Sequence, residues 1–503
     1  MKMAKSLFLG STAALIALGG AQAADLPVKA KAVEYVKICT LYGAGFYYIP
    51  GTDTCIRLGG YLRAETTFGT SYHHDAPNSG VGGARNRLSE YYSARSRQDL
   101  FVDTRTATEY GVVRTFAEFA WTYTGGTYSG TGTGGTAYTT SLGNQVAQGT
   151  PGFYQAFMQF AGFTFGKAAS QFSTNWGQYA ANSYELPGAG GWDRANQIAY
   201  TFEFGQGISA SISAEDQVSR NQLAIWNVSS ATAAGLATGA YGANDIGGAR
   251  APDLVASVTV DQAWGYFKAS FAAHDNHAAY YGASELTGHP DDKWGWAGQL
   301  GLSIKNVPTG PGDTINMSGV YTNGASRYNF HDYTAAPSFA MYGGTGLVGA
   351  YQSVGLAGVS DSVFVAGSGQ ELTTTYGFQG GYTHNWNPYW ASSIFGAYAA
   401  VRYNNTAKGY ICGAFVANLA LSTGLAGCNP DFNYSVIGTR TIWTPVKNLA
   451  FTAELAYTML DQKHASGSTV ALPAQAAIAK PGGTYELKDQ NALTLLIRAQ
   501  RNF

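Results

Sequence analysis

The sequence has little charge, and it lacks long hydrophobic runs beyond its N-terminal end. Charged residues make up 12% of the 503 residues, about half of the usual share. A helical membrane protein needs repeated apolar runs of about 20 residues, and none follows the N-terminal run. The 30 basic residues nearly balance the 31 acidic residues without forming a basic block. The composition therefore argues against a helical membrane protein and against a nucleic-acid-binding protein.

Glycine and aromatic residues are abundant instead. The chain has 65 glycines and 34 tyrosines, and aromatic residues reach 14%. Disordered chains are poor in aromatic residues and rich in charge, so this composition argues against disorder. A charge-poor chain rich in glycine and aromatic residues suits a large β-structure with one face toward lipid.

The N-terminal end has the pattern of an export signal. Two lysines precede an apolar run from Leu7 to about Leu18, and an A-x-A cleavage site ends at Ala23. The alternative is an uncleaved anchor, but the apolar part is short for a membrane span. We expect a cleaved secretory signal over residues 1–23.

The four cysteines form two equally spaced pairs, Cys39 with Cys55 and Cys412 with Cys428. Four cysteines in an exported chain allow three pairings, and loop closure favours the local one. The alternative of a metal site is disfavoured, because there is no C-x-x-C motif and no histidine near the first pair. We expect two local disulfides, each stabilising the fold by roughly 3 kcal/mol on the chain-entropy account.

The C-terminal end alternates between apolar and polar residues. Leu493, Leu495 and Ile497 lie in one register, and Arg498 lies in the other. This period of two is typical of a transmembrane β-strand, although a half-buried strand of a soluble sandwich would show it too. The terminal Phe503 resembles the sorting signal that outer-membrane barrels present to their assembly machinery.

The same alternation recurs along the chain and favours a barrel over a sandwich. We count about 16 strands, with a range of 14 to 18 because strand boundaries are uncertain by a few residues. The expected strands cover about residues 57–68, 95–105, 113–123, 153–163, 165–172, 196–205, 207–217, 253–260, 264–274, 294–305, 313–322, 371–384, 389–403, 433–443, 448–460 and 487–503. Short turns alternate with long Gly/Ser/Thr-rich connections, as in outer-membrane barrels. Aromatic girdles are expected near strand ends at Trp121, Tyr123, Trp264, Trp294, Trp386, Trp390 and Trp443.

Several segments resemble the alphaproteobacterial porins. The stretch from Val33 to Tyr61 is similar to the start of the mature porins, and further matches cover 103–111, 159–167 and 493–503. The loops at 218–252, 323–370 and 404–432 show no such likeness. The resemblance implies a 16-stranded trimeric outer-membrane porin whose third external loop folds into the pore. The implied partners are two further copies of the chain, outer-membrane lipid and lipopolysaccharide, the assembly machinery and small hydrophilic solutes.

Three parts of the chain follow from these patterns. They are the signal over 1–23, a periplasmic segment with a local disulfide over 24–56, and the transmembrane barrel over 57–503. The expected function is a water-filled channel for passive diffusion of small hydrophilic solutes and ions across the outer membrane. A channel specific for sugars or organic acids remains an alternative. An energy-coupled transporter is not expected, since the segment before the first strand is too short for a plug domain.

Charged side chains at the narrowest point determine the selectivity of such a channel. Strand parity turns five arginines of the first three strands toward the lumen, and the third external loop, expected over about 173–195, carries two acids. Arginines on the wall that face acids on the loop would produce a transverse field. The alternative is that these charges are solvated wall residues. The predicted constriction consists of Arg63, Arg95, Arg97, Arg105, Arg114, Glu185 and Asp193.

Signals for catalysis, cofactors and metals are weak. The sequence has no G-x-S-x-G, P-loop or H-E-x-x-H motif. The pairs His73-His74 and His274-x2-His277 lack the helix or carboxylate partner of a good metal site, so solvated loop histidines are the better interpretation. An outer-membrane enzyme is therefore a poor alternative, and we expect neither cofactor nor metal.

Overall fold

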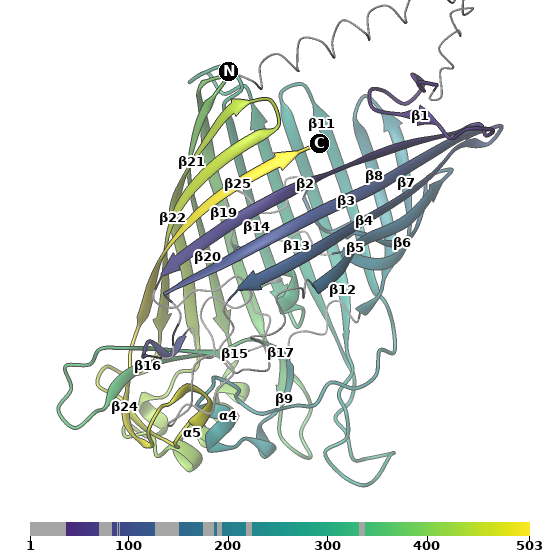
Figure 1. Ribbon diagram of the computed structural model, residues 1–503. Helices are drawn as coiled ribbons and strands as arrows, with labels where there is room; N and C mark the ends of the chain where they lie inside the picture. The colour runs from purple at the N-terminus through teal and green to yellow at the C-terminus, as the bar shows by residue number, and fades with distance from the viewer. Residues whose placement is uncertain are drawn as a thin grey trace, which may run out of the picture.

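A computed structural model describes residues 37–69, 83–87, 89, 91–125, 150–174, 186–188, 194–217, 224–330 and 338–503. Within these ranges sixteen antiparallel strands form one closed barrel (Figure 1). In chain order the barrel strands are β2 (Thr54–Gly69), β3 (Tyr92–Thr108), β4 (Gly111–Gly125), β5 (Thr150–Phe160), β6 (Phe163–Ala169), β7 (Arg194–Gly205), β8 (Ile208–Glu215), β11 (Asp253–Gln262), β12 (Gly265–Asn276), β13 (Lys293–Lys305), β14 (Thr314–Asn323), β19 (Thr374–Asn387), β20 (Trp390–Arg402), β21 (Phe432–Val446), β22 (Leu449–Gln462) and β25 (Gln490–Asn502). The predicted all-β barrel and its number of strands are confirmed.

The barrel closes where its first strand meets its last. β2 pairs with β25 from Tyr61↔Asn502 to Gly69↔Thr494, and with β3 along its other edge. The remaining barrel strands pair with their neighbours in chain order. Closure removes the open edge, so backbone N–H and C=O groups find partners without water, as a membrane requires.

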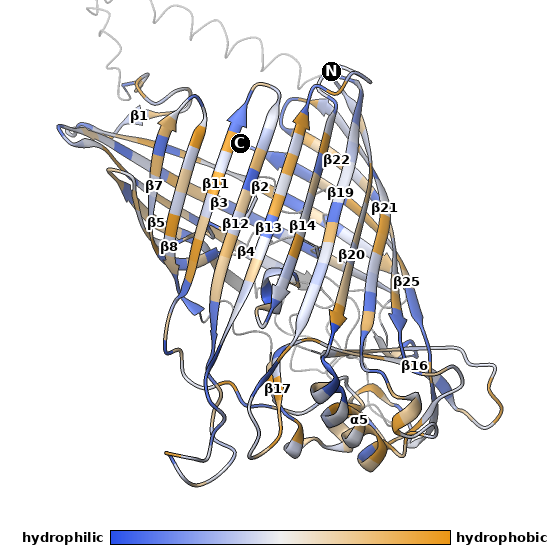
Figure 2. Cartoon of the chain, turned by 180° about the vertical axis from the view of Figure 1, so that it is seen from behind, coloured by the Kyte–Doolittle hydropathy of each residue, from blue (hydrophilic) through white to orange (hydrophobic). Residues whose placement is uncertain are grey.

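The two faces of the wall differ as strand parity predicts. Apolar side chains such as Leu62, Leu300 and Ile437 point outward and are 55%, 60% and 60% exposed. Charged side chains such as Glu65 and Arg498 point inward and are buried. Figure 2 shows apolar and polar residues alternating along the strands. The aromatic residues expected at strand ends are all exposed, consistent with interfacial girdles.

Short turns join the strands at one end of the barrel, which lies at the top of Figure 1 with the C-terminus. Gly207 in the turn between β7 and β8 has φ +72°, and a Cβ there would lie 1.9 Å from the Asp261 carbonyl oxygen. Only glycine fits this turn without strain. The short β1 (Tyr47–Tyr48) pairs with β2 at the same end. The disulfide between Cys39 and Cys55 joins the segment that precedes β1 to strand β2 of the wall.

Long loops at the opposite end fold into a separate layer (Figure 1). Its helices are α4 (Ala233–Leu236) and α5 (Asn405–Leu419), with the 3-10 turns η2 (Val228–Ser230), η3 (Ser326–Tyr328), η4 (Leu425–Gly427) and η5 (Ala476–Ile478). Its strands are β9 (Ala224–Asn227), β10 (Ala243–Asn244), β15 (Ser338–Gly343), β16 (Gln352–Gly358), β17 (Ser360–Phe364), β18 (Glu371–Leu372), β23 (Thr469–Leu472) and β24 (Gly483–Leu487). No helix in the described ranges is long and apolar enough to cross a membrane.

The loop layer has its own apolar core, which the sequence analysis did not foresee. Trp226, Tyr241, Leu356 and Phe415 are buried there together with inward residues of β20 to β22. The strands of this layer belong to two small sheets that contain parallel pairs, β9 with β17 and β16 with β24. The Cys412–Cys428 disulfide ties α5 to the following turn, so both expected local disulfides are confirmed.

Candidate functional site in the barrel lumen

The described ends of the connection between β6 and β7, residues 170–174 and 186–188, lie inside the barrel, where the third external loop was expected. At its start, Phe172 is fully buried against Val255, Ala297 and Tyr328, and its carbonyl accepts a bond of 3.0 Å from Gln299 Nε2. These partners lie on the inner face of the wall or on the inward turn η3. Near its other end, Gly188 packs against the backbone of Phe378. The described parts of this loop therefore lie on the inner wall of β11 to β14 and β19 and narrow the lumen.

A three-arginine cluster surrounds Asp103 at the short-turn end. Arg105 Nη2 and Arg114 Nε each lie 3.0 Å from the carboxylate, and Arg57 Nη2 lies 3.7 Å from it. Asp103 is fully buried, whereas the three guanidiniums remain partly exposed. One carboxylate thus fixes three arginines by charge-assisted contacts and leaves the cluster with excess positive charge.

Aromatic rings support this cluster from the lumen side. The guanidiniums of Arg57 and Arg105 lie 5.2 and 4.9 Å from the ring of Phe46, which belongs to the disulfide-linked N-terminal segment. Arg114 lies 5.2 Å from the ring of Phe116, which stacks between Phe101 and Phe157. Cation–π contacts of this kind hold a guanidinium without cancelling its charge.

A second group of arginines lies nearer the middle of β2 and β3. Arg63 and Arg97 are directly opposite each other in the strand register. Arg63 Nε donates to Gln500 Oε1 (2.8 Å), and Arg97 Nε donates to Thr122 Oγ1 (2.9 Å). Next to them, Arg498 forms a buried ion pair of 2.5 Å with Glu65.

The two tyrosines of this region stack under arginines. The Arg63 guanidinium lies 4.6 Å from the Tyr61 ring. Arg97 and Arg194 lie 5.5 and 5.1 Å from the ring of Tyr154. Arg63 and Arg97 are therefore held by neutral side chains, in contrast with the arginines around Asp103.

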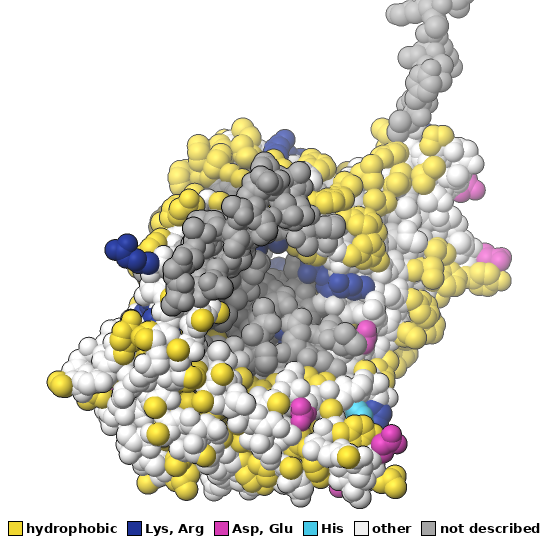
Figure 3. All heavy atoms as spheres, turned by 60° about the horizontal axis from the view of Figure 1, so that its bottom comes forward, with side chains coloured by type: hydrophobic (Ala, Val, Ile, Leu, Met, Phe, Trp, Pro, Cys, Tyr) yellow, Lys and Arg dark blue, Asp and Glu magenta, His cyan; other side chains and the backbone are white. Residues whose placement is uncertain are grey.

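Acidic side chains gather on the far side of the lumen, at the long-loop end of β11 and β12. Asp253 accepts bonds from Tyr328 Oη (2.6 Å) and pairs with His274 Nδ1 (2.7 Å). The other His274 nitrogen lies 3.8 Å from Asp361 of β17. Burial raises the pKa of Asp361 to about 6, and the nearby His274 opposes this rise. Figure 3 views the molecule from the long-loop end, where basic side chains border the hollow.

The structure divides the predicted constriction residues between two depths. Arg63, Arg95 and Arg97 lie together near mid-wall, whereas Arg105 and Arg114 lie at the short-turn end around Asp103. Glu185 and Asp193 fall outside the described residues. No role was predicted for Arg57, Arg194, Arg498, Tyr61 and Tyr154. Their positions in the inward-facing register of each strand could have identified them as lumen residues. The sequence does not show how deep in the barrel each of them lies.

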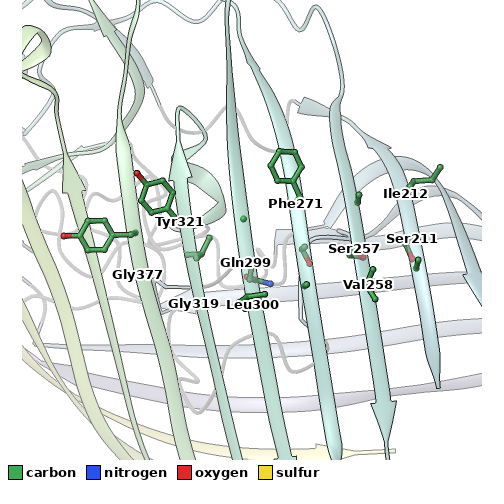
Figure 4. A pocket seen from close by; sticks show the side chains of 17 residues that line it. Ser211, Ile212, Ser257, Val258, Phe271, Gln299, Leu300, Gly319, Tyr321 and Gly377 are labelled. Carbon is green, nitrogen blue, oxygen red and sulfur yellow. The ribbon is translucent and has the colours of Figure 1, made fainter. Parts of the chain in front are cut away.

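Two described cavities lie on the outer face of the wall. One of about 850 Å³ is lined by Ile212, Val258, Phe271, Leu300 and Tyr321, with gaps above Gly298 and Gly319 (Figure 4). Its lining is almost wholly apolar and faces the membrane side. Acyl chains fill such hollows in a bilayer, so they do not mark the transport path.

Three of the five described histidines, His274, His277 and His384, contact carboxylates. His274 pairs with Asp253, and His277 Nδ1 lies 2.6 Å from Asp292. Within the described part of the chain, no three or more His, Cys, Asp or Glu side chains are grouped so that they could hold a metal ion. His73 and His74 lie outside the described residues.

A closed sixteen-stranded barrel with an apolar outside, a charged inside and an inserted third loop defines the class of outer-membrane channel proteins. The chain belongs to the porin subfamily, whose sequence profile matches residues 25–496. This membership places it in the outer membrane, in a family of channels and not of enzymes.

Among curated proteins, the chain is similar to the porin Omp2b of Brucella suis biovar 1, at 36% identity over 213 residues. That match covers 42% of this chain and 53% of the relative, and Omp2b of Brucella canis gives the same values. The chain thus spans about half the length of the curated relatives it matches. Among solved structures, the outer-membrane channel DcaP of Acinetobacter baumannii has a TM-score of 0.54 at 17% identity, covering 91% of this chain and 99% of that one.

Proposed function

We propose that this protein is a passive diffusion channel for small hydrophilic solutes and ions. The observation that carries the proposal is the charged inner face of a closed sixteen-stranded barrel, which suits a water-filled lumen. Planar-bilayer recording of the purified protein tests it. An ohmic conductance in potassium chloride supports the proposal, and the absence of conductance from correctly folded protein contradicts it.

The distribution of charge supports a preference for anions. Arg63 and Arg97 on one wall have neutral side chains as close partners, and Asp103 is shared by three arginines. The acids of the opposite wall lie toward the long-loop end, around His274. The field between them runs across the lumen, so that polar solutes align in it. Organic acids are therefore favoured over neutral sugars as specific solutes.

We propose that three copies associate through the outer face of β2 to β4. Ser96, Gln98 and Thr104 point outward from β3, where other strands expose residues such as Leu300 and Ile437. A primary amide is costly against lipid but can be hydrogen-bonded in a protein interface. Chemical cross-linking in detergent tests this assembly. A trimer that is lost when Gln98 becomes Arg supports it, and an unchanged oligomer contradicts it.

Export and assembly follow from the ends of the chain. We propose that residues 1–23 are a cleaved signal, that 24–56 form a periplasmic segment and that 57–503 form the barrel inserted by the assembly machinery through Phe503. The lipid-facing wall then contacts outer-membrane lipid and lipopolysaccharide. Mass analysis of the mature protein tests the cleavage site, and removal of Phe503 is expected to lower the yield of inserted barrel.

A further inference from the structure

Two arginines, Arg63 and Arg97, face each other in the middle of the wall, and neither forms an ion pair with a described carboxylate, although Glu65 and Asp99 lie near Arg97. Arg63 of β2 and Arg97 of β3 are direct cross-strand neighbours on the inner face. Like charges opposite each other destabilise a sheet. Stability of the wall therefore does not explain this pair.

Neutral groups fix both side chains in place. Arg63 Nε donates to Gln500 and its guanidinium stacks on Tyr61, while Arg97 Nε donates to Thr122 and stacks on Tyr154. Tyr61 also lies beside Arg97. These two bonds use Nε and not the terminal nitrogens of either guanidinium. Their positive charge is oriented but not cancelled.

The nearby carboxylates have other close partners. Glu65 is held at 2.5 Å by Arg498. Glu118 accepts a bond of 2.7 Å from Gln155, and Asp99 lies beside Glu118. In the described part of the chain, neither Arg63 nor Arg97 forms an ion pair with a carboxylate, in contrast with Arg105 and Arg114 on Asp103.

We propose that Arg63 and Arg97 form a binding subsite for an oxyanion group, a phosphate or a carboxylate of a passing solute. Two guanidinium forks can each donate two parallel hydrogen bonds to such a group, which relieves the repulsion between them. A chloride ion lacks the spread oxygens that match this geometry. The proposal rests on the proposed channel function, because the solute must reach the subsite through the lumen.

The test compares oxyanions with chloride in the intact protein. Single-channel current is recorded in potassium chloride, and inorganic phosphate or succinate is added at constant ionic strength. We expect both to reduce the current in a saturable manner. In the double variant Arg63→Gln, Arg97→Gln, the half-blocking concentration is expected to rise about tenfold or more, since several charge-assisted hydrogen bonds are lost.

Two further variants separate binding from a general effect of charge. Arg63→Lys with Arg97→Lys keeps both charges but removes the forks, and we expect it to retain anion preference while losing most of the block. Lys305→Gln with Arg501→Gln removes two positive charges at the short-turn rim and outer face, and we expect block as in the native protein. Equal block in the native and Arg63→Gln, Arg97→Gln proteins overturns the subsite. Absence of any current instead contradicts the channel function itself.

Discussion

At the scale of residues, the sequence predicts which side chains of a strand face the lumen, but it does not predict which side chains contact one another. Alternation alone turned Arg97 and Arg105 toward the lumen, because one face of each strand must be apolar in a membrane. It did not reveal that Arg105 shares Asp103 with Arg114, while Arg97 lies opposite Arg63. Those partnerships depend on strand register and tilt, which a single sequence leaves undetermined.

Replacing Arg97 with Ala is expected to shift the reversal potential toward cations. The change removes a positive charge that forms no ion pair with a described carboxylate, so the local potential falls. Reversal potential in a potassium chloride gradient measures the shift, with circular dichroism as the control for folding. An unchanged potential would count against a place for Arg97 at the selective point.

Replacing Asp103 with Asn is expected to act in the opposite direction. Three arginines would then face one another around a neutral amide, which raises the positive potential and weakens the wall at the short-turn end. The expected results are a reversal potential shifted toward anions and a lower thermal unfolding midpoint. A midpoint equal to that of the native protein would show that the three arginines do not depend on this carboxylate.

At the scale of elements, all sixteen barrel strands were predictable and the loop layer was not. Each strand lies between lipid and water, so apolar and polar residues alternate along it, as they do from Leu493 to Arg498. The helix α5 buries Ile411 and Phe415 in a core to which five different loops contribute. Such long-range packing leaves no periodic signal in a Gly-rich segment, so its secondary structure could not be read from the sequence.

The turn between β7 and β8 is expected to tolerate glycine alone at position 207. In Gly207→Ala, a Cβ at positive φ would collide with the Asp261 carbonyl, so we expect a loss of about 1–3 kcal/mol of stability. Thermal unfolding monitored by the electrophoretic shift of the barrel measures this loss. Gly248→Ala is the matched control, since a Cβ there meets nothing within 4 Å. Equal midpoints for the two variants would refute the strain argument.

The loop layer is expected to respond to pH through Asp361. Burial raises the pKa of this folded-state carboxyl to about 6, above its usual value of 3.8. The folded state therefore holds the proton more tightly, and the stability from this group is complete at low pH and is lost as the pH rises through about 6. We expect hydrogen-exchange protection in β17, after correction for the intrinsic pH dependence of amide exchange, to fall across that range in the native protein. A variant with Asp361→Asn should lose this dependence, and its persistence would exclude Asp361 as the cause.

At the scale of the whole molecule, the two faces of the barrel wall suit two environments, lipid outside and water inside. The outer wall is apolar and hollowed above glycines, which suits acyl chains, while the inner wall carries arginines on one side and acids on the other. The described ends of the third loop pack against the inner wall through Phe172 and Gly188. The few charged residues of the barrel wall therefore lie mainly on its inner face.

The most direct test of this account is the current through a single purified channel in a potassium chloride gradient. The account predicts an open, ohmic pore whose reversal potential favours anions, and a loss of that preference when Arg63 and Arg97 are both replaced with Gln. Correctly folded protein that carries no current, or a pore that favours cations, would contradict it.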